Sequence, residues 1–457
     1  MLLGLPPSED IGPTPTDGEA TRPRLMTEGA LRLSRNPYVW LLLIFLLALA
    51  VRGVWSLYAD ANPRAAWRWD ATIYDSEAYA LAKGDGYVDF QGKPTAHWPP
   101  GYPLALAPLY RLSDNSLLVA SLFNAVLGSL TVVFLYLLGA KIFGRLAGLT
   151  AALLLALFPN QVFFTSQTMT ETLFTTLLVL SLVLVVYLLL ASKPPLLWHL
   201  ALVGVLLGCA SLVRGEALLL FAVIAPALYL RWRSWRATLR YSAVFVLGMA
   251  VVIAPWTVRN IVRMRAPILI STSATEALWV GHHEGADGKI ADFSVADAYA
   301  GVSNPEKEVK MNNEALRQAL SFIRAHPLDD LQLIPKKLSF LYRADSSGIR
   351  WLQLGAPTIN AGDATKLQTL GNDYYWVGLA LAILGVPGWF SLRDPSKALL
   401  LGVVIYWTLL FSVVFFGDER FHFPLEPILA LWAAASILAI GKLLLRRRPV
   451  RRRATAY

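Results

Sequence analysis

The stretch SLLVASLFNAVLGSLTVVFLYLLG, residues 116–139, runs from end to end without a charged side chain. An α-helix rises about 1.5 Å per residue, so a helix over this stretch is long enough to cross the hydrocarbon core of a bilayer, which is about 30 Å thick. Its apolar residues form a continuous block and do not follow the spacing of an amphipathic helix. The stretch therefore predicts a transmembrane helix.

The composition of the whole chain agrees with this prediction. Of its 457 residues, 56% are hydrophobic and only 16% are charged, whereas a soluble domain carries about a quarter charged residues. We therefore expect an all-α polytopic membrane protein, with a bundle of about ten transmembrane helices within residues 37–444. The ten expected spans are residues 37–58, 116–139, 146–158, 162–192, 197–213, 215–231, 241–258, 373–392, 398–416 and 424–444.

Basic residues gather at the ends of the apolar blocks, and the net charge is +10. We expect a disordered tail over residues 1–36 and a basic tail over residues 445–457. By the positive-inside rule, both tails are expected in the cytoplasm. The expected membrane is the plasma (inner) membrane. Basic residues in these positions attract anionic headgroups, so we expect membrane lipid as a partner and no nucleic acid. The single cysteine, Cys209, excludes an internal disulfide.

Two long polar segments then fall on the outer side of the membrane, residues 59–115 and residues 259–372. Long loops in compact proteins usually carry function, so we expect the functional site there. In the second loop, residues 305–326 show helical spacing of apolar side chains before Pro327, which predicts a surface helix. No internal repeat is apparent, unlike transporters that are built from paired halves.

In the first outer loop, residues 71–83 predict a short helix with Asp70 as its N-cap residue. On this helix Asp70, Tyr74 and either Glu77 or Ala78 share one face, and Asp75 lies on the neighbouring face. Apolar side chains on the same helix favour a position at the membrane interface. Several carboxylates gathered at a membrane surface favour a substrate site over simple helix capping.

The run Pro-Pro-Gly-Tyr-Pro, residues 99–103, follows this helix. Prolines remove backbone donors and fix φ, so we expect no regular helix here but a rigid re-entry into the bilayer. An acidic residue, a tyrosine four positions later, a helix ending in Gly-x-Gly-aromatic and then this proline run resemble the first external loop of GT-C glycosyltransferases. Within that superfamily the loop is most similar to the ArnT-like and protein-mannosyltransferase-like group.

Four further stretches resemble the same family, in the same order along the chain. They are ALFPNQVFFTSQTMTETLF (156–174), GCASLVRGEALLL (208–220), APWTVRN (254–260) and ERFHFPLEPILALWAA (419–434). The resemblance implies a GT-C-like bundle and an enzyme that transfers a sugar from a polyprenyl-phosphate carrier at the outer membrane face. Asp70 matches the family's catalytic acidic position. His97 stands where the ArnT branch often has an acidic-basic pair, and we include it among the substrate-binding candidates.

We therefore expect an inverting membrane glycosyltransferase that uses a polyprenyl-phosphate sugar donor and a glycan, lipid or protein acceptor. Asp70 is the expected base that takes the proton from an acceptor hydroxyl. If the acceptor is itself a phosphate, no strong base is needed, and Asp70 would position the acceptor or bind a divalent metal. The alternative is a flippase or polymerase of lipid-linked saccharides without this transfer activity.

The leaving phosphate needs cations, and arginine can bind it through two parallel hydrogen bonds. Arg259 and Arg420 are candidates because each stands at the outer end of an expected span. Lys336 and Lys337 in the second outer loop are further candidates. The alternative for such residues is that they only anchor the chain to lipid headgroups.

Other polar residues leave two interpretations each. Glu171 is a substrate-binding candidate within the membrane if its span begins near residue 162, and it carries no meaning if it lies solvated in a loop. Arg214 and Glu216 form either a structural pair or part of a donor pocket. His282 and its histidine neighbour are expected in a polar loop, since adjacent histidines rarely bind one metal. We expect no firmly required cofactor, and the identity of any metal ligands stays unassigned.

Overall fold

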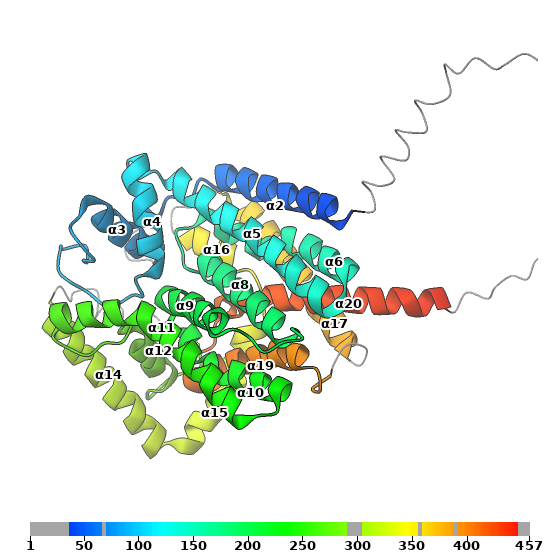
Figure 1. Ribbon diagram of the computed structural model, residues 1–457. Coiled ribbons are helices and arrows are strands. Elements are labelled where there is room, and N and C mark those ends of the chain that lie inside the picture. Colours follow the sequence, from blue (N-terminus) through cyan, green and yellow to red (C-terminus); the bar gives the residue numbers. More distant parts are fainter. Residues whose placement is uncertain (1–35, 66–69, 290–303, 355–358, 387–390, 447–457) are drawn as a thin grey trace, which may run out of the picture.

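The computed structural model describes residues 36–65, 70–289, 304–354, 359–386 and 391–446, and the fold is built from helices (Figure 1). Among these residues, the only extended pairing is an isolated bridge between Val88 and Pro94. The all-α prediction is therefore confirmed. The two expected cytoplasmic tails lie almost entirely outside the described residues.

Seven helical segments of the described chain are long and apolar enough to cross a membrane. They are α2 (Pro37–Ala59), α5 (Leu117–Phe143), α8 (Glu171–Leu189), Gly215–Trp232 with α10 (Phe221–Trp232), α11 (Trp235–Met264), Pro395–Val414 with α19 (Pro395–Leu409), and Glu419–Leu444 with α20 (Glu426–Arg446). An eighth is α6 (Arg145–Ala156) if it is counted together with Pro159–Ser166, to which it is joined by a bend of 58°. The chain is a multi-pass membrane protein, but the expected number of ten spans is not confirmed.

Two expected spans account for most of this difference. The apolar helix α9 (Leu197–Val213) has only 17 residues and is shorter than a typical span. The expected span 373–392 corresponds to α17 (Ala361–Leu384), which begins earlier, among polar residues, and ends earlier. The apolar run thus gave the bounds of α9 correctly, whereas at α17 it marked a helix without giving its ends.

Beside the bend after α6 lies the side chain of Arg52, which is fully buried in α2. Its guanidinium donates hydrogen bonds to the carbonyl oxygens of Leu155 (3.2 Å) and Ala156 (3.0 Å). These are carbonyls that a helix end leaves without a partner inside the helix. The chain then restarts at Pro159 in α7 (Pro159–Phe163), because a proline in a first helical turn removes no needed donor.

The first outer loop contains α3 (Asp70–Lys83), as predicted, and α4 (Gly101–Ser113). The expectation that residues 99–103 form no regular helix is therefore wrong for residues 101–103. Proline is tolerated in a first turn because the N–H groups there have no partner within the helix. Pro99 and Pro100 lie before the helix, where their fixed φ suits an entry into it.

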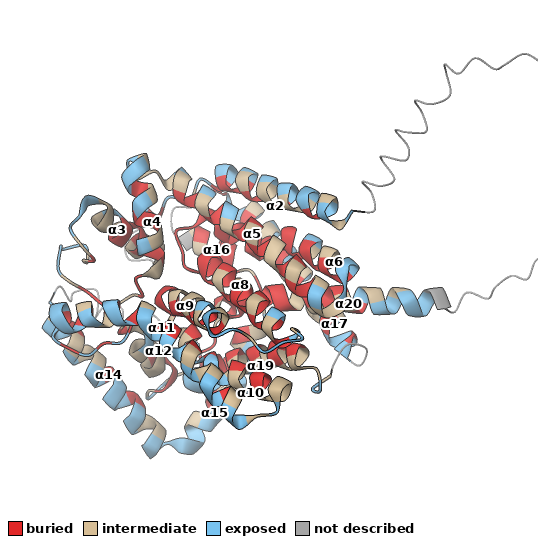
Figure 2. Cartoon of the chain, viewed as in Figure 1, coloured by how far each residue is buried: buried red, intermediate tan, exposed pale blue. Residues whose placement is uncertain are grey.

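The predicted surface helix is also present, as α14 (Pro305–Ala325), followed by α15 (Pro327–Tyr342) and α16 (Ser347–Leu354). With α3, α4 and α12 (Ser273–Gly281), α14 lies at the end of the bundle opposite the start of α2 and the end of α20 (Figure 1). Figure 2 shows that α8 is buried in the middle of the bundle, whereas α14 is largely exposed.

Close helix packing at the centre depends on glycine. Helix α9 packs along α11, and a Cβ atom added to Gly204 would lie only 2.1 Å from the carbonyl oxygen of Phe245. Across the same contact, a Cβ atom on Gly248 would lie 2.5 Å from the carbonyl oxygen of Ala201. Small residues at helix contacts are typical of membrane bundles, where they allow two backbones to approach closely. The two glycines hold α9 in place and so position the segment that follows it.

Candidate active site

A cavity of about 890 Å³ lies between α3, the loop after it, α12, α14 and residues 406–421. One part of its lining is charged or polar, and another part is apolar. The charged and polar residues include Asp70, Tyr74, Glu77, His97, Arg214, Glu216, Glu276 and Arg420. The apolar residues include Leu218, Leu219, Leu410, Phe411, Phe415, Phe416 and Phe421. A lining of this kind suits an amphiphilic molecule with a charged head.

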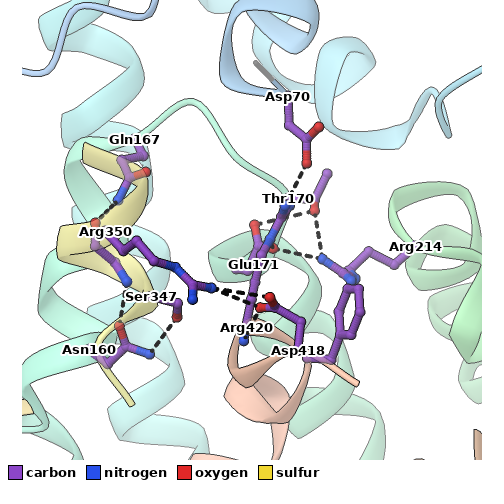
Figure 3. Close-up of polar contacts among 12 residues, drawn as sticks. Asp70, Asn160, Gln167, Thr170, Glu171, Arg214, Ser347, Arg350, Asp418 and Arg420 are labelled. Atoms are coloured by element: carbon purple, nitrogen blue, oxygen red, sulfur yellow. Dashed lines mark hydrogen bonds and ion pairs between the residues drawn. The ribbon is translucent and has the colours of Figure 1, made fainter. Parts of the chain in front are cut away.

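Asp70 and Arg420 meet on the wall of this cavity (Figure 3). Asp70 is the first residue of α3, and its Oδ2 accepts a hydrogen bond of 2.5 Å from Nη1 of Arg420. Nε of Arg420 donates to Oε1 of Glu171, the first residue of α8. The face of the guanidinium packs over Trp351, with 4.9 Å between its central carbon and the ring centre. Arg420 therefore bridges two carboxylates from different helices.

Arg214 completes this charged cluster from the end of α9. Its Nη1 lies 2.8 Å from Oε1 of Glu171 and 3.2 Å from the hydroxyl of Thr170, and its Nη2 lies 2.9 Å from Oε1 of Glu216. Glu171 is only 1% exposed, so the interpretation that it lies solvated in a loop is wrong. It does not line the cavity but lies behind the two arginines and holds them. We call Asp70, Glu171, Arg214, Glu216 and Arg420 the cavity cluster.

The cavity cluster does not offer an obvious place for a divalent metal. Its carboxylates from α3 and α8 are bridged by the guanidinium of Arg420, which occupies the position that a metal between Asp70 and Glu171 would need. The cluster contains three carboxylates and two guanidinium groups, so its formal charge is −1. The carboxylates and guanidinium groups of the cavity cluster thus pair with one another.

Tyr74 and Glu77 line the cavity on the face of α3 that the sequence predicted. Burial raises the pKa of the Tyr74 hydroxyl well above its usual value and keeps it neutral. Burial also raises the pKa of the Glu77 carboxyl. The hydroxyl of Tyr87 lies 2.7 Å from Glu77 and 2.9 Å from the carbonyl oxygen of Trp98, so a protonated Glu77 allows both contacts to be hydrogen bonds.

His97 also lines the cavity, and its partner there was not predicted. Its Nε2 lies 3.3 Å from Oε2 of Glu276 in α12. Burial raises the pKa of the Glu276 carboxyl, and the neighbouring His97 opposes that shift. Nothing in the sequence around Glu276 marks it as part of a site, because the contact depends on the folding of α12 against the first outer loop.

Besides Glu171, four predicted substrate-binding residues do not line the cavity. Asp75 instead accepts hydrogen bonds from Arg64 (2.8 Å) and from the hydroxyl of Tyr110 (2.6 Å). Arg259 donates to the carbonyl oxygens of Thr95 and Tyr87 and thereby ties the first outer loop to α11. Both residues stabilise the conformation of the first outer loop, and their charged groups are engaged in these hydrogen bonds. The other two residues are the adjacent lysines of α15.

Lys336 and Lys337 differ sharply from each other. Lys336 is exposed, whereas Lys337 is completely buried, with its Nζ 3.2 Å from Nε2 of His282. Burial lowers the pKa of the Lys337 ammonium to about 8. Nδ1 of His282 lies 2.5 Å from Oδ1 of Asp330, so this histidine is buried in a polar contact with α15 and does not lie in an open polar loop.

Comparison with known proteins supports a family resemblance. Residues 97–258 match the family model described as dolichyl-phosphate-mannose-protein mannosyltransferase. No curated protein matches the sequence. The fold is similar to that of AglB, an archaeal oligosaccharyltransferase from Archaeoglobus fulgidus solved with an inhibitory peptide and a dolichol-phosphate, with a TM-score of 0.50 and 13% identity over 88% of this chain and 51% of that one.

It is also similar to ArnT from Cupriavidus metallidurans in the apo state, with a TM-score of 0.53 and 15% identity over 89% of this chain and 62% of that one. The chain thus spans about half the length of AglB and less than two thirds of ArnT. At these identities the structures establish the fold, and the family model adds a sequence match in the region that contains α4 to α11. The resemblance inferred from the sequence is confirmed for the fold: this multi-pass membrane protein has a fold similar to those of AglB and ArnT.

Proposed function

We propose that this chain is an inverting glycosyltransferase that moves a sugar from a polyprenyl-phosphate donor to an acceptor at the non-cytoplasmic face of the membrane. The observation that carries the proposal is the contact of Asp70 with Arg420 on the cavity wall, because it brings a base and a phosphate-binding cation together. The dolichol-phosphate in AglB and the mannosyltransferase family match support the choice of donor class.

The two parts of the cavity lining suit the two parts of such a donor. The apolar residues around Phe411 and Phe415 would contact the first isoprene units, and Arg420 and Arg214 would contact the phosphate. Nη2 of Arg420 has no hydrogen-bond partner among the described residues, so it can donate to a phosphate oxygen without breaking the two existing ion pairs. Tyr74 and the His97–Glu276 pair would contact the sugar or the acceptor.

The transfer is a single displacement at the anomeric carbon. Asp70 takes the proton of the acceptor hydroxyl, the acceptor oxygen forms a bond to the anomeric carbon, and the bond from this carbon to the phosphate oxygen breaks. The electron pair of that bond leaves with the polyprenyl phosphate, whose charge changes from −1 to −2. Arg420 stabilises this added charge. One displacement from the opposite side inverts the anomeric configuration.

Reconstitution of the purified chain with a panel of polyprenyl-phosphate sugars tests the proposal. We expect one donor to be consumed with release of polyprenyl phosphate, and Asp70→Asn to lower the rate by at least about 100-fold, as for loss of a general base. The matched control is Asp85→Asn, which changes an exposed carboxylate in the same loop and should leave the rate unchanged.

Full activity of Asp70→Asn would remove Asp70 from the mechanism. If no donor of the panel is consumed, while labelled lipid-linked saccharide crosses the bilayer of the proteoliposomes, the chain is a flippase and not a transferase. Polymer formation from a lipid-linked oligosaccharide would instead indicate a polymerase. The anomeric configuration of the product, measured by NMR, tests the single displacement independently.

A further inference from the structure

Three buried side chains converge outside the cavity, in the interior of the bundle. They are Asp345 just before α16, His422 in the turn of 3₁₀-helix Glu419–Leu425, and Glu426 at the start of α20. Their exposed fractions are 0%, 2% and 1%. One potential ligand atom from each lies within 4.8 Å of those of the other two. We call these residues the buried triad.

The hydrogen bonds of His422 set which of its nitrogens faces the other two residues. Nδ1 lies 2.6 Å from the carbonyl oxygen of Leu341, and a carbonyl can only accept, so Nδ1 carries a proton. A neutral ring then has its lone pair on Nε2, which lies 3.3 Å from Oδ1 of Asp345. This is the arrangement of a metal-binding histidine, whose second nitrogen donates to a carbonyl or carboxylate and so fixes the ring.

Each residue of the buried triad has one polar atom that no hydrogen bond satisfies. Nε2 of His422, Oδ2 of Asp345 and Oε2 of Glu426 are buried without a hydrogen-bond partner. Asn160 is the one side chain of the described residues that donates to both carboxylates, through Nδ2 to Oδ1 of Asp345 and to Oε1 of Glu426 at 3.1 Å. Buried polar atoms without partners are costly, and two buried carboxylates so close together also repel each other.

Among the described residues, no lysine or arginine forms an ion pair with either carboxylate, and the basic side chain beside Asp345 is His422 itself. Of the arginines close to the triad in sequence, Arg343 packs over the ring of Phe340, Arg350 pairs with Asp418 (3.1 Å) and Glu419 (3.4 Å), and Arg420 pairs with Asp70 and Glu171. The triad therefore presents one imidazole nitrogen and two carboxylates in a closed polar site without a counter-charge. One nitrogen and two oxygen ligands suit a divalent ion such as Zn²⁺, which accepts imidazole and carboxylate, or Mn²⁺, which favours carboxylate.

We propose that Asp345, His422 and Glu426 bind one divalent transition-metal ion. The ion would join α20 and the turn that carries Arg420, two residues before His422, to the segment that enters α16 and carries Trp351. Since Trp351 packs over the guanidinium of Arg420, the ion would position the phosphate-binding arginine from behind. It would not contact the substrate, because none of the three ligands lines the cavity.

Metal content and thermal unfolding of the full chain in detergent test this inference. Protein stripped with a chelator is incubated with ZnCl₂ or, separately, MnCl₂, then desalted and analysed by plasma mass spectrometry. We expect about one ion per chain and an unfolding temperature that rises with ion concentration, because an ion that binds only the folded state stabilises it. His422→Gln and Glu426→Gln should each weaken binding by at least about 100-fold, more than the loss of a group behind the ligands.

Two matched variants separate this site from others. His282→Gln removes an equally buried histidine that contacts Asp330, but Lys337 already supplies a cation there, so the metal content should not change. Asp70→Asn should also keep the ion, which distinguishes the buried triad from metal binding at the cavity cluster. The result is independent of whether the chain transfers sugar.

Wild-type protein that retains no ion from either salt would overturn the proposal, and so would a folded His422→Gln variant that binds the ion as tightly as the wild type. Loss of the ion in Asp70→Asn together with its retention in Glu426→Gln would move the site to the cavity. If His422→Gln does not fold, Glu426→Asp serves instead. That variant keeps the charge but shortens the ligand, so we expect weaker ion binding, and unchanged affinity would contradict the assignment.

Discussion

Two groups of carboxylates meet in one short segment, residues 418–426, and their negative charges are compensated in different ways. In the cavity cluster, Glu171 contacts the guanidinium groups of both Arg214 and Arg420. In the buried triad, Asp345 and Glu426 share only the amide of Asn160 and the ring of His422. The chain thus supplies its own cations in the first group and supplies none in the second.

The difference follows from what each group has to do. Fixed guanidinium groups at a cavity wall can stabilise a charge that appears during a reaction, because they are already oriented before the reaction starts. A site closed on all sides gains nothing from such groups, but it can hold an exchangeable ion. Buried carboxylates in this fold therefore mark two kinds of site, and the cations near them distinguish one kind from the other.

The largest effect should come from breaking the cavity cluster at Arg420. Arg420→Met leaves Glu171 and Asp70 without their shared partner, and removal of one side of a buried ion pair costs about 3–5 kcal/mol of unfolding free energy. Loss of the cation should also lower sugar transfer by about 100-fold or more. Thermal unfolding and kcat/KM for the polyprenyl-phosphate donor measure the two effects separately.

The double variant Arg420→Met, Glu171→Gln is the control for this prediction. Without the Glu171 charge, the buried site no longer needs a cation, so we expect the double variant to recover much of the lost stability but none of the transfer activity. Recovery of both would mean that Arg420 acts only on folding. Unchanged donor affinity in the single variant would contradict its role as the phosphate ligand.

A smaller effect should come from Lys337, which presents the reverse of the buried triad, a buried cation without a carboxylate in contact. The pKa of its ammonium falls from 10.5 to about 8 in the folded chain because of burial. Between these pH values the unfolded chain holds a proton that the folded chain has lost, so the stability of the folded state should rise with pH from about 8 to 10.5.

Lys337→Met should remove this rise and stabilise the chain at pH 7 by about 2 kcal/mol, since the cost of burying the charge disappears. The control is Lys336→Met, because the neighbouring lysine is exposed and its removal should leave the pH dependence as it is. Thermal unfolding across pH 7 to 10.5 measures both variants. If the stability of Lys337→Met rises with pH as steeply as that of the wild type, the rise does not come from Lys337, and the prediction is wrong.

Much of the fold could be predicted from the sequence because unbroken apolar runs have few alternatives to a membrane span. The number of spans could not, because the apolar run that forms α9 is only 17 residues long. The polar start of α17 likewise hides where that helix begins.

The candidate site, too, could be predicted only in part from the sequence. Asp70, Tyr74 and Glu77 share a face of one short helix, so their common position followed from helical spacing alone. Arg259 was expected at a phosphate and instead binds two backbone carbonyls, because the first outer loop folds back onto α11. No local pattern records a contact of this kind.

The buried triad could also be predicted only in part from the sequence. His422 and Glu426 are four positions apart, a spacing that places two side chains on one face of a helix and could have been noticed. Their third partner, Asp345, lies far away in the chain and was brought to them only by the packing of α17 against α20. A pair of potential ligands in the sequence therefore did not indicate a site until the fold supplied the third.

The smallest expected effect distinguishes the two groups of carboxylates most directly. The same change, glutamate to glutamine, should alter the stability of the chain in opposite directions in the two groups. Glu171→Gln removes a negative charge from between two arginines and should destabilise the chain. Glu426→Gln removes one of two repelling carboxylates and places an amide donor beside Asp345, so in chelator-treated protein it should stabilise the chain by about 1 kcal/mol. With ZnCl₂ or MnCl₂ present, the order should reverse, because only the wild type gains stability from the ion. Thermal unfolding with and without the salts decides it, and a Glu426→Gln variant that is less stable than the wild type under chelation would show that the two carboxylates are already compensated within the chain.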